Sequence, residues 1–341
     1  MVYLIELIKF IGFMKKKILI IRWSGMGDIV MTLPALQWIR DRFPDAAISY
    51  LTDTSFAAIP RMSGLADEVF AVDRRGFKTP RRVIQAAGGV LKTAGRLAFS
   101  SFHAAFDLQG FGETAILARL SGAPLRAGRV KGSWLRRRMY TFSISGDWEK
   151  EHRTAFFVRA VSGAFGEPFP QGPHFPSLPR PKGAFPDTSR VVGLNIGAST
   201  ESRRWSEDHF FKLARLLSRQ GWGVKFFVGP GEIPLIPKVH DACAKNRWGF
   251  SFHDRLGPFI RDLCRNRMLI SNDTGPGHLA AAFGMPVVTL FSTGTPGNVA
   301  PMARRSAWLR EKDDINRIRP EDVAGAALEL LGPAPVIPGS P

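Results

Sequence analysis

Short apolar runs alternate with longer amphipathic segments along most of the chain. Apolar runs of about five residues predict buried strands, and apolar residues spaced three and four apart predict helices. We expect strands at residues 18–22, 47–51, 105–108, 191–196, 224–228, 268–271 and 287–291. We expect helices at residues 29–42, 83–97, 114–120, 207–219 and 320–331. This alternation is typical of βαβ units built on parallel sheets.

A proline-rich segment, residues 166–186, interrupts the alternation. Its closely spaced prolines exclude a continuous helix or a central strand, so we predict a linker between two domains. The 341 residues are also long for a single core. We expect an α/β protein with two Rossmann-like domains and a ligand cleft between them. The predicted parts are an apolar extension (1–13), a first domain (14–165), a linker (166–189), a second domain (190–318), and a C-terminal helix and tail (319–341) whose helix packs back on the first domain.

The apolar extension, residues 1–13, is interrupted by Glu6 and Lys9. It is too short to span a bilayer, and it lacks the basic start and the cleavage site of a signal peptide. Met14 then begins a strand-like segment, MKKKILIIRW. An over-extended start site and a short interfacial anchor explain the extension equally well.

The chain has 47 Lys and Arg against 29 Asp and Glu, which gives a formal net charge of +18. An excess of this size predicts a polyanionic partner, such as nucleic acid, an anionic membrane or a phosphorylated glycolipid. Nucleic acid is the least favoured, because the sequence has no zinc-finger spacing, RNP-type strand or basic-region heptad. Cys243 and Cys264 form no CxxC pair, which fits a reducing cytosol.

The loop WSGMGD, residues 23–28, follows the first predicted strand and precedes a helix. A dinucleotide-binding loop would have its third glycine where Val30 stands, so nicotinamide and flavin cofactors are not expected. The Asp28 carboxylate also lies where a bound pyrophosphate would need positive potential. Two interpretations of Asp28 are equally favoured: a first-turn or capping residue of the helix, or a general base presented by a glycine-flanked turn.

The loop NDTGPGH, residues 272–278, follows another predicted strand and opens an alanine-rich helix. Glycines, a threonine hydroxyl and free N–H groups at a helix start can bind an anion. A capped helix with Asp273 as N-cap and Pro276 in its first turn explains half of these features. It does not explain the glycines on both sides of Pro276, nor His278.

Two further loops follow predicted strands. GASTESRRW, residues 197–205, offers hydroxyls and two guanidinium groups to a diphosphate, although a solvated loop anchored by Trp205 would have the same sequence. A Gly-Pro-Gly turn places Glu232 where its carboxylate could hold a ribose diol, which is a weak signal alone. The sequence contains no Asp-x-Asp pair, metal-spaced cluster, Walker A loop or Gly-x-Ser-x-Gly turn, so no metal or cofactor is expected.

Together these loops resemble those of the heptosyltransferases, glycosyltransferase family nine, over about residues 15–301. The matching pieces, in family order, are ILIIRWSGMGDIVMTLPAL, FDLQG with ILARLSGAPLRAG, NIGAS with RRWSEDHF, VGPGE, and SNDTGPGHLAAAFGMPVVTLF. The resemblance implies a GT-B fold, with residues 14–165 on the acceptor side and 190–318 binding the nucleotide sugar. It implies an inverting transfer of heptose from ADP-heptose to the lipopolysaccharide inner core, in the cytoplasm and peripherally at the inner membrane.

The same resemblance assigns roles to individual residues. Asp28, preceded by Gly27, would be the general base. The donor would be bound by Thr200, Arg203, Glu232, Asp273, Thr274, Gly275 and His278. On the acceptor side, the predicted residues are Gln109 of the FDLQG piece and Arg126 and Arg129. The basic stretch 126–138 would face the anionic glycolipid or the membrane, although a merely solvated basic loop is equally favoured.

Two features depart from the family pattern. Glu113 stands where family members often have a basic residue, and FSTGTPGN replaces a loop that often resembles Gly-Pro-Thr/Ser-Asp-Pro. Both leave the donor sugar and the acceptor open, so a GT-B transferase with another nucleotide sugar is an alternative. A non-catalytic two-domain sugar-binding protein is a second alternative, but it would not need Asp28.

Overall fold

The computed structural model describes residues 16–74, 76, 79–130, 132–146, 149–182, 184 and 189–332. The predicted extension at 1–13, part of the predicted linker and residues 333–341 lie outside the described residues. The chain divides into two compact units. The first is built from the chain up to Ser24, Ala35–Gly146 and Phe157–Gln171, and the second from Gly25–Pro34, Asp147–Phe156 and the chain from Gly172 onward.

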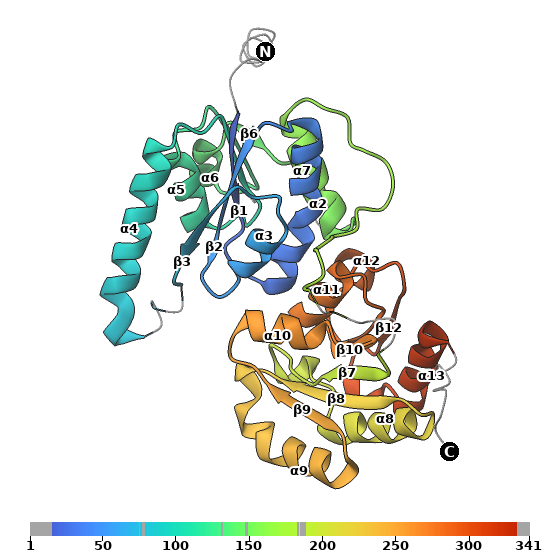
Figure 1. The fold of residues 1–341 in the computed structure, drawn as a ribbon. Coiled ribbons are helices and arrows are strands. Elements are labelled where there is room, and N and C mark those ends of the chain that lie inside the picture. The colour runs from blue at the N-terminus through green and yellow to red at the C-terminus, as the bar shows by residue number, and fades with distance from the viewer. Residues whose placement is uncertain are drawn as a thin grey trace. The chain divides into compact units, whose positions relative to one another are not determined.

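The first unit is organised around a sheet of six parallel strands (Figure 1). The strands are β1 (Lys17–Ile21), β2 (Ala47–Asp53), β3 (Glu68–Val72), β4 (Ala104–Asp107), β5 (Leu125–Gly128) and β6 (Phe142–Ser143). Their order across the sheet is β3-β2-β1-β4-β5-β6, and all paired neighbours are parallel. The order reverses between β1 and β4, which is where ligands usually bind beside a parallel sheet.

Helices cover both faces of this sheet, with α4, α5 and α6 on one side and α2 and α7 on the other (Figure 1). The helices are α2 (Met26–Arg42), α3 (Ala58–Met62), α4 (Val83–Phe99), α5 (Gly112–Leu120), α6 (Trp134–Met139) and α7 (Arg153–Ala164). One core cluster joins Leu19 and Ile21 of β1 to Leu97 of α4 and Leu117 of α5. Because both faces are covered, the strands are apolar on both sides, as parallel sheets require.

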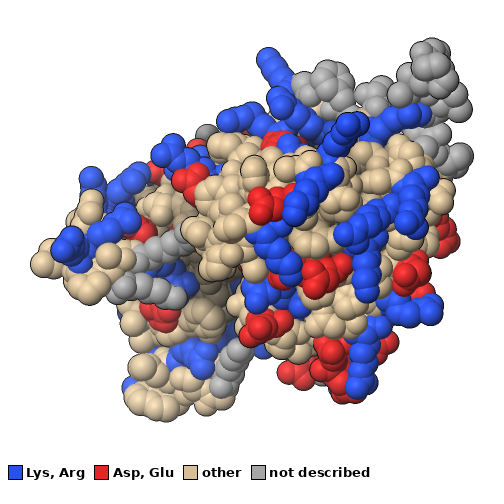
Figure 2. All heavy atoms as spheres, turned by 90° about the horizontal axis from the view of Figure 1, so that it is seen from below, with Lys and Arg blue, Asp and Glu red and all other residues tan. Residues whose placement is uncertain are grey.

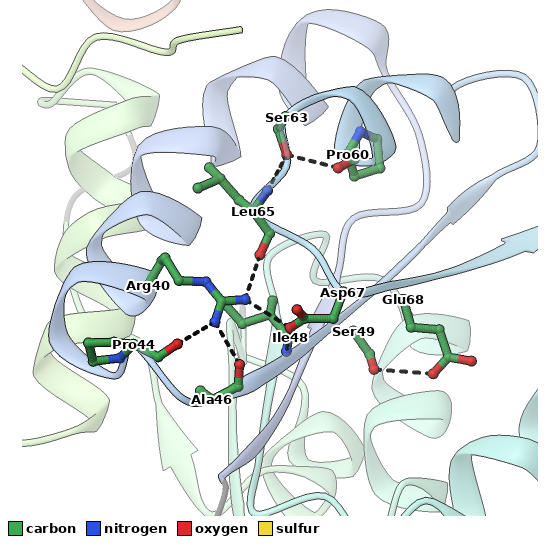
Figure 3. Close-up of polar contacts among 10 residues, drawn as sticks. All are labelled: Arg40, Pro44, Ala46, Ile48, Ser49, Pro60, Ser63, Leu65, Asp67 and Glu68. Carbon is green, nitrogen blue, oxygen red and sulfur yellow. Dashed lines mark hydrogen bonds and ion pairs between the residues drawn. The ribbon is translucent and has the colours of Figure 1, made fainter. Parts of the chain in front are cut away.

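The end of α2 is fixed by Arg40 (Figure 3). Its guanidinium donates hydrogen bonds to the carbonyl oxygens of Pro44 (2.8 Å), Ala46 (2.8 Å) and Leu65 (3.2 Å), and to the Asp67 carboxylate (2.8 Å). Asp67 also accepts a bond from a backbone N–H of β2, at 2.7 Å. These bonds tie the last turn of α2 to the segments that enter β2 and β3, and so they orient the helix whose first turn carries Asp28.

The second unit contains another sheet of six parallel strands. The strands are β7 (Val191–Asn195), β8 (Gly223–Val228), β9 (Gly249–Phe252), β10 (Met268–Asn272), β11 (Val287–Phe291) and β12 (Ser306–Arg310). Their order is β12-β11-β10-β7-β8-β9. Counted from the first strand of each sheet, this is the same Rossmann-like order as in the first unit, and it reverses between β7 and β10.

The helices of the second unit connect its strands in turn. They are α8 (Glu207–Arg219), α9 (Ile236–Asn246), α10 (Leu256–Leu263), α11 (Gly275–Ala282), α12 (Pro296–Val299) and α13 (Pro320–Leu331), with short 3-10 helices at Glu201–Arg203, Pro230–Leu235 and Ile315–Arg317. Among the helices of the described residues, none combines the length and apolarity needed to cross a bilayer.

The last helix packs on the second unit, so the expectation that it packs back on the first was wrong. Val323, Ala327 and Leu331 of α13 are buried in the same core cluster as Leu213 and Leu217 of α8. These α13 residues are spaced four apart and form one apolar stripe. The stripe is buried against α8, which lies directly beside α13 in the second unit.

The predicted α/β architecture and the predicted strands and helices are confirmed, with ends that differ by at most three residues. The helix expected from residue 29 already begins at Met26, so Asp28 lies in its first turn. The strands β3, β5, β6, β9 and β12 were not predicted. The strand β6 has only two residues, and β5 and β9 have four residues each, one of them a glycine. The strands β3 and β12 lie at the edges of their sheets and have a polar residue at one or both ends. None of the five strands therefore shows a long apolar run.

Candidate functional site

The predicted donor-binding residues follow the carboxyl ends of three strands in the second unit. Thr200 and Arg203 come after β7, Glu232 comes after β8, and residues 273–278 come after β10. β10, β7 and β8 are consecutive in the sheet. Because parallel strands end at the same edge of a sheet, the fold brings all these residues to one edge, beside the reversal of strand order.

The buried side chain of Asn272, the last residue of β10, connects these loops. Its Nδ2 donates to the carbonyl oxygens of Ile196 and Gly197, each at 3.1 Å. Its Oδ1 accepts a hydrogen bond from the backbone N–H of Trp205, also at 3.1 Å. The amide therefore holds the 197–205 loop at both ends. The Trp205 ring anchors the same end of the loop, because it is fully buried and its Nε1 donates to the Ile318 carbonyl at 3.0 Å.

Arg203 joins the loops that follow β7, β10 and β11. Its Nε donates to Thr293 Oγ1 at 2.8 Å, and its guanidinium lies 3.8 Å from the Asp273 carboxylate. The side chain is about one-third exposed, so the guanidinium remains open to a ligand. Thr200 lies before the short 3-10 helix that contains Arg203, with its hydroxyl 3.3 Å from that of Ser202. The neighbouring guanidinium, that of Arg204, lies instead 3.9 Å from Glu201.

Helix α11 begins directly after β10, with Thr274 as its N-cap residue. The alternative interpretation with Asp273 as N-cap was therefore wrong, because Asp273 lies one residue before the cap. The Thr274 hydroxyl makes no capping bond; it donates to the Asn272 carbonyl at 3.2 Å and accepts from Asn195 Nδ2 at 3.3 Å. The N–H groups at the start of α11 are thus left uncapped by the Thr274 side chain, as an anion-binding helix start requires.

Glycines bring the loop around Asp28 close to α11. Residues Gly25–Pro34 belong to the same compact unit as α11. A Cβ on Gly27 would lie 2.6 Å from the His278 ring, and a Cβ on Gly275 would lie 2.6 Å from Met26. Gly25 has φ +88°, and a Cβ there would lie 2.4 Å from an Asp28 carboxylate oxygen. Only glycine fits at these positions without displacement of a neighbour, so Gly27 acts through close packing.

The electrostatics of this cluster shift two pKa values. Burial raises the pKa of Asp273 to about 6; the Arg203 charge opposes this rise and the Asp28 charge adds to it. Burial lowers the pKa of His278 to about 4; the Asp28 charge opposes this fall and His152 adds to it. Near pH 7, therefore, Asp273 is mostly ionised and His278 is neutral. Over the described part of the chain, no group of three His, Cys, Asp or Glu side chains could hold a metal ion.

Glu232 is buried between two glycine-containing loops. Its carboxylate accepts a hydrogen bond from the Gly229 N–H at 3.2 Å. A Cβ on Gly197 would lie 2.9 Å from three atoms of the same carboxylate. The Gly-Pro-Gly turn and Gly197 therefore fix Glu232 at the ends of β7 and β8, on the same edge as Arg203.

Gln109 lies in the first unit and supports the segment that leads to α2. Its Oε1 accepts hydrogen bonds from the backbone N–H groups of Trp23 and Ser24, each at 3.1 Å. Asp107 in turn accepts bonds from the N–H groups of Gln109 and Gly110, each at 2.9 Å. Gln109 thus connects the ends of β1 and β4, where the strand order of the first sheet reverses.

Tyr140 completes this network with a bond of 2.6 Å from its hydroxyl to Asp107. Asp107 is fully buried, and burial raises its pKa while the bonds from Tyr140 and the amides lower it. The Tyr140 ring fits because Gly128 has no side chain: a Cβ there would lie 2.2 Å from the ring. Asp107, Tyr140 and Asn272 were not predicted as site residues from the sequence. The available signal was a polar residue at the end of a buried strand, which Asp107 and Asn272 share.

The two predicted arginines of the acceptor side also lie in the first unit. Arg126 donates from its guanidinium to the carbonyl oxygens of Ala123 and Met139, so it holds the β5–β6 connection together. Arg129 follows β5, and its Cβ lies 3.4 Å from the position of a Cβ on Gly110. Glu113, the departure from the family pattern, lies 3.8 Å from Arg74. A role of either arginine in acceptor binding stays a prediction.

Replacement of Asp28 by Asn should lower the pKa of both Asp273 and His278, because the Asp28 charge raises both. NMR titration of the Asp273 carboxyl carbon and the His278 imidazole nitrogens should give midpoints near 6 and 4 in the wild type. Both midpoints should fall in the variant. Asp45→Asn, at an exposed carboxylate of the first unit, is the matched control and should move neither. Midpoints that stay unchanged in Asp28→Asn would contradict this electrostatic coupling.

Solved structures with the same fold include two of about the same length. The structure of Escherichia coli heptosyltransferase WaaC with ADP superimposes with a TM-score of 0.80 at 20% identity, covering 92% of this chain and 99% of that one. A glycosyltransferase family 9 protein from Veillonella parvula gives a TM-score of 0.79 at 22% identity, covering 93% and 97%. The two Rossmann-like sheets are therefore those of a GT-B fold, as predicted.

Sequence comparisons point to the same family. Lipopolysaccharide heptosyltransferase 1 of Pseudomonas aeruginosa is 25% identical over 303 residues, 86% of this chain and 83% of its own. The Escherichia coli K12 protein of the same name is 25% identical over 316 residues, 86% of this chain and 93% of its own. The model of glycosyltransferase family 9 (heptosyltransferase) matches residues 90–319. The chain therefore belongs to glycosyltransferase family 9, the heptosyltransferases, and is a glycosyltransferase with the GT-B fold.

Proposed function

We propose that this enzyme transfers heptose from ADP-heptose to the lipopolysaccharide inner core with inversion at the anomeric carbon. One observation carries the proposal. In this family 9 chain, Asp28 lies close enough to Asp273 and His278, beside the start of α11, for its charge to raise the pKa of both. The names of the relatives support the acceptor, since they are lipopolysaccharide heptosyltransferases. A solved structure of similar fold contains ADP-2-deoxy-2-fluoro heptose, which supports the donor.

In the proposed reaction, Asp28 accepts the proton of an acceptor hydroxyl. The hydroxyl oxygen attacks the anomeric carbon of heptose from the face opposite the diphosphate. The bond between that carbon and the diphosphate oxygen breaks, and ADP leaves with the bonding electron pair. The Gly25 turn supports this role because the Asp28 carboxylate packs directly against a residue with no side chain.

The charge that develops on the leaving diphosphate needs positive partners. Arg203, the Thr200 hydroxyl and the backbone N–H groups at Thr274 and Gly275 would supply them. The partial exposure of Arg203 supports this role, since its guanidinium is held by Thr293 and still open to a ligand. The pKa of His278, lowered to about 4, keeps the ring neutral, so it would donate or accept a hydrogen bond rather than supply charge.

The rest of the donor and acceptor would be recognised by residues farther from the diphosphate. Glu232 would accept hydrogen bonds from both hydroxyls of the donor ribose. Gln109 would act indirectly, because its side chain holds the segment before α2. Arg126 and Arg129 would lie on the acceptor side of the first unit. The enzyme would work peripherally at the cytoplasmic face of the inner membrane, where such an acceptor is made.

The donor itself distinguishes the proposal from its alternative, a family member that uses another nucleotide sugar. ADP-heptose should raise the thermal unfolding temperature more than UDP-sugars at equal concentration, because ligand binding stabilises the folded state in proportion to affinity. Transfer from ADP-heptose to a heptose-free inner-core acceptor should proceed in excess EDTA. Stabilisation by UDP-sugars alone would refute the donor, and turnover that EDTA abolishes and magnesium restores would refute the metal-free mechanism.

Asp28→Asn should lower turnover by about 10²–10⁴-fold, the usual contribution of a positioned general base. Asp28 lies in the first turn of α2 and Asn keeps its size and hydrogen-bonding shape, so the fold should be retained. Donor binding should not weaken, because the change removes a negative charge from a cluster that would face a diphosphate. Turnover, ADP affinity and thermal unfolding of the variant test this directly. A folded variant with near wild-type turnover would leave Asp28 with a structural role in the first turn of α2.

Arg203→Ala should weaken ADP binding by about 1.5–3 kcal/mol, the contribution of a charge-assisted hydrogen bond. Arg204→Ala is the matched control, because it removes the same charge one residue away while Arg204 faces Glu201. Calorimetric titration with ADP should show a large loss for the first variant and little for the second. If Arg204→Ala caused the larger loss, the diphosphate contact would belong to Arg204.

A further inference from the structure

Helix α4 is apolar on two opposite faces. Ala86, Thr93 and Leu97 are its buried residues, and they pack toward the first sheet. On the other side, Ile84 is 86% exposed, Leu91 is 74% exposed and Phe99 is 90% exposed. A surface helix normally carries polar residues on its outer face, so exposed apolar side chains here need a separate explanation.

The exposed apolar residues form one stripe along the helix. Leu91 lies two turns after Ile84, and Gly88 and Gly95 lie on the same line between Ile84 and Phe99. In the described part of the chain, no atom lies within 4 Å of a Cβ placed on Gly88 or Gly95. The stripe therefore faces open space within the first unit.

The stripe continues onto the two neighbouring helices. α5 packs against both α4 and α6, and Figure 1 shows the three helices on the same side of the sheet. Their exposed large apolar residues include Ile116 and Leu120 of α5 and Trp134 and Leu135 of α6. Of the 13 exposed large hydrophobic residues among those described, nine lie between residues 83 and 135. We call the outer surface of α4, α5 and α6 the α4–α6 face.

The same segment is strongly basic. Residues 81–138 contain 11 Lys and Arg against two Asp and Glu, a net charge of +9, which is half of the total of +18. Of the two acidic residues, Asp107 is buried and Glu113 lies 3.8 Å from Arg74. Arg82 and Arg96 pair with Asp73 and Glu68. With the acidic side chains that the structure describes, Lys92, Arg119 and Arg137 form no ion pair. Figure 2, which views the molecule from below, shows Lys and Arg interspersed with Asp and Glu over that side.

We propose that the α4–α6 face docks on the surface of an anionic lipid bilayer. Ile84, Leu91 and Phe99 insert among the lipid chains, and Trp134 lies at the level of the headgroups. Lys92, Arg119 and Arg137 pair with anionic headgroups. A second copy of the chain would bring two basic surfaces together, so charge favours the anionic bilayer. The inference deepens the proposed function, because it names the surface that reaches a membrane-embedded acceptor.

Vesicle binding tests the face without any turnover. The full chain is titrated with phosphatidylcholine vesicles with and without phosphatidylglycerol. The apolar variant is Ile84→Gln/Leu91→Gln, and its control is Phe252→Gln/Trp308→Gln, at exposed apolar residues of the second unit. The charge variant is Lys92→Gln/Arg119→Gln/Arg137→Gln, and its control is Lys212→Gln/Arg215→Gln/Arg219→Gln on α8, which removes the same charge from exposed positions of the second unit.

The wild type should bind the anionic vesicles at least about tenfold more tightly than the neutral ones. The apolar variant and the charge variant should each bind the anionic vesicles at least about tenfold more weakly than the wild type. Both controls should bind like the wild type. All variants should keep the wild-type thermal unfolding temperature, and the apolar variant and its control should also keep the wild-type rate on a lipid-free acceptor, so that a folding defect is separated from a docking defect.

Equal binding of all variants, or wild-type binding that ignores phosphatidylglycerol, would overturn the proposal. A dimer detected by light scattering that the apolar variant dissociates, with vesicle binding unchanged, would assign the face to a second copy instead. Residues 1–13 are present in every variant, so any contribution from them cancels. If vesicle binding depends on the face as expected but no acceptor is glycosylated, the docking surface stands and the proposed function fails.

Discussion

The edge of the second sheet depends on one buried amide, the side chain of Asn272. Its three hydrogen bonds join the end of β10 to both ends of the 197–205 loop. A buried amide that lost a partner would cost about 1–3 kcal/mol for each unsatisfied group, so the loops and the strand favour one common arrangement. Arg203 lies within that loop and Thr274 follows Asn272 directly. The positions of both predicted donor contacts therefore follow from the conformation of a residue that need not touch the donor.

Several glycines of the site also have a packing role that the sequence did not indicate. The glycines of NDTGPGH were interpreted as part of a cradle for an anion. In the structure, Gly275 accommodates Met26, and Gly277 accommodates Ser271 and Pro301. Gly25 and Gly197 similarly leave room for the carboxylates of Asp28 and Glu232. What these positions share is a missing side chain that lets a neighbouring group approach the main chain closely.

The fold class could be predicted from the sequence because buried parallel strands give continuous apolar runs, and seven of the strands show such a run. Short strands such as β5, with the sequence LRAG, carry no such signal and are held by their neighbours. Site residues on loops after predicted strands, such as Arg203 and Asp273, could be placed on one sheet edge. The Asp107–Tyr140 bond could not be predicted, because it joins residues 33 positions apart through a gap left by Gly128.

A diphosphate ligand alone does not explain where the excess of positive charge, +18 in total, lies along the chain. At the donor edge, the Arg203 guanidinium already lies 3.8 Å from Asp273, and the Asp28 charge is close enough to raise the pKa of Asp273. That edge therefore carries mixed charge and does not account for the excess. Half of the excess lies in residues 81–138, where the acidic side chains are few and the apolar ones are exposed. A nucleotide needs a few well-placed donors, whereas an anionic bilayer presents many charges over a wide area, so the proposed docking surface accounts for more of this excess than the donor site does.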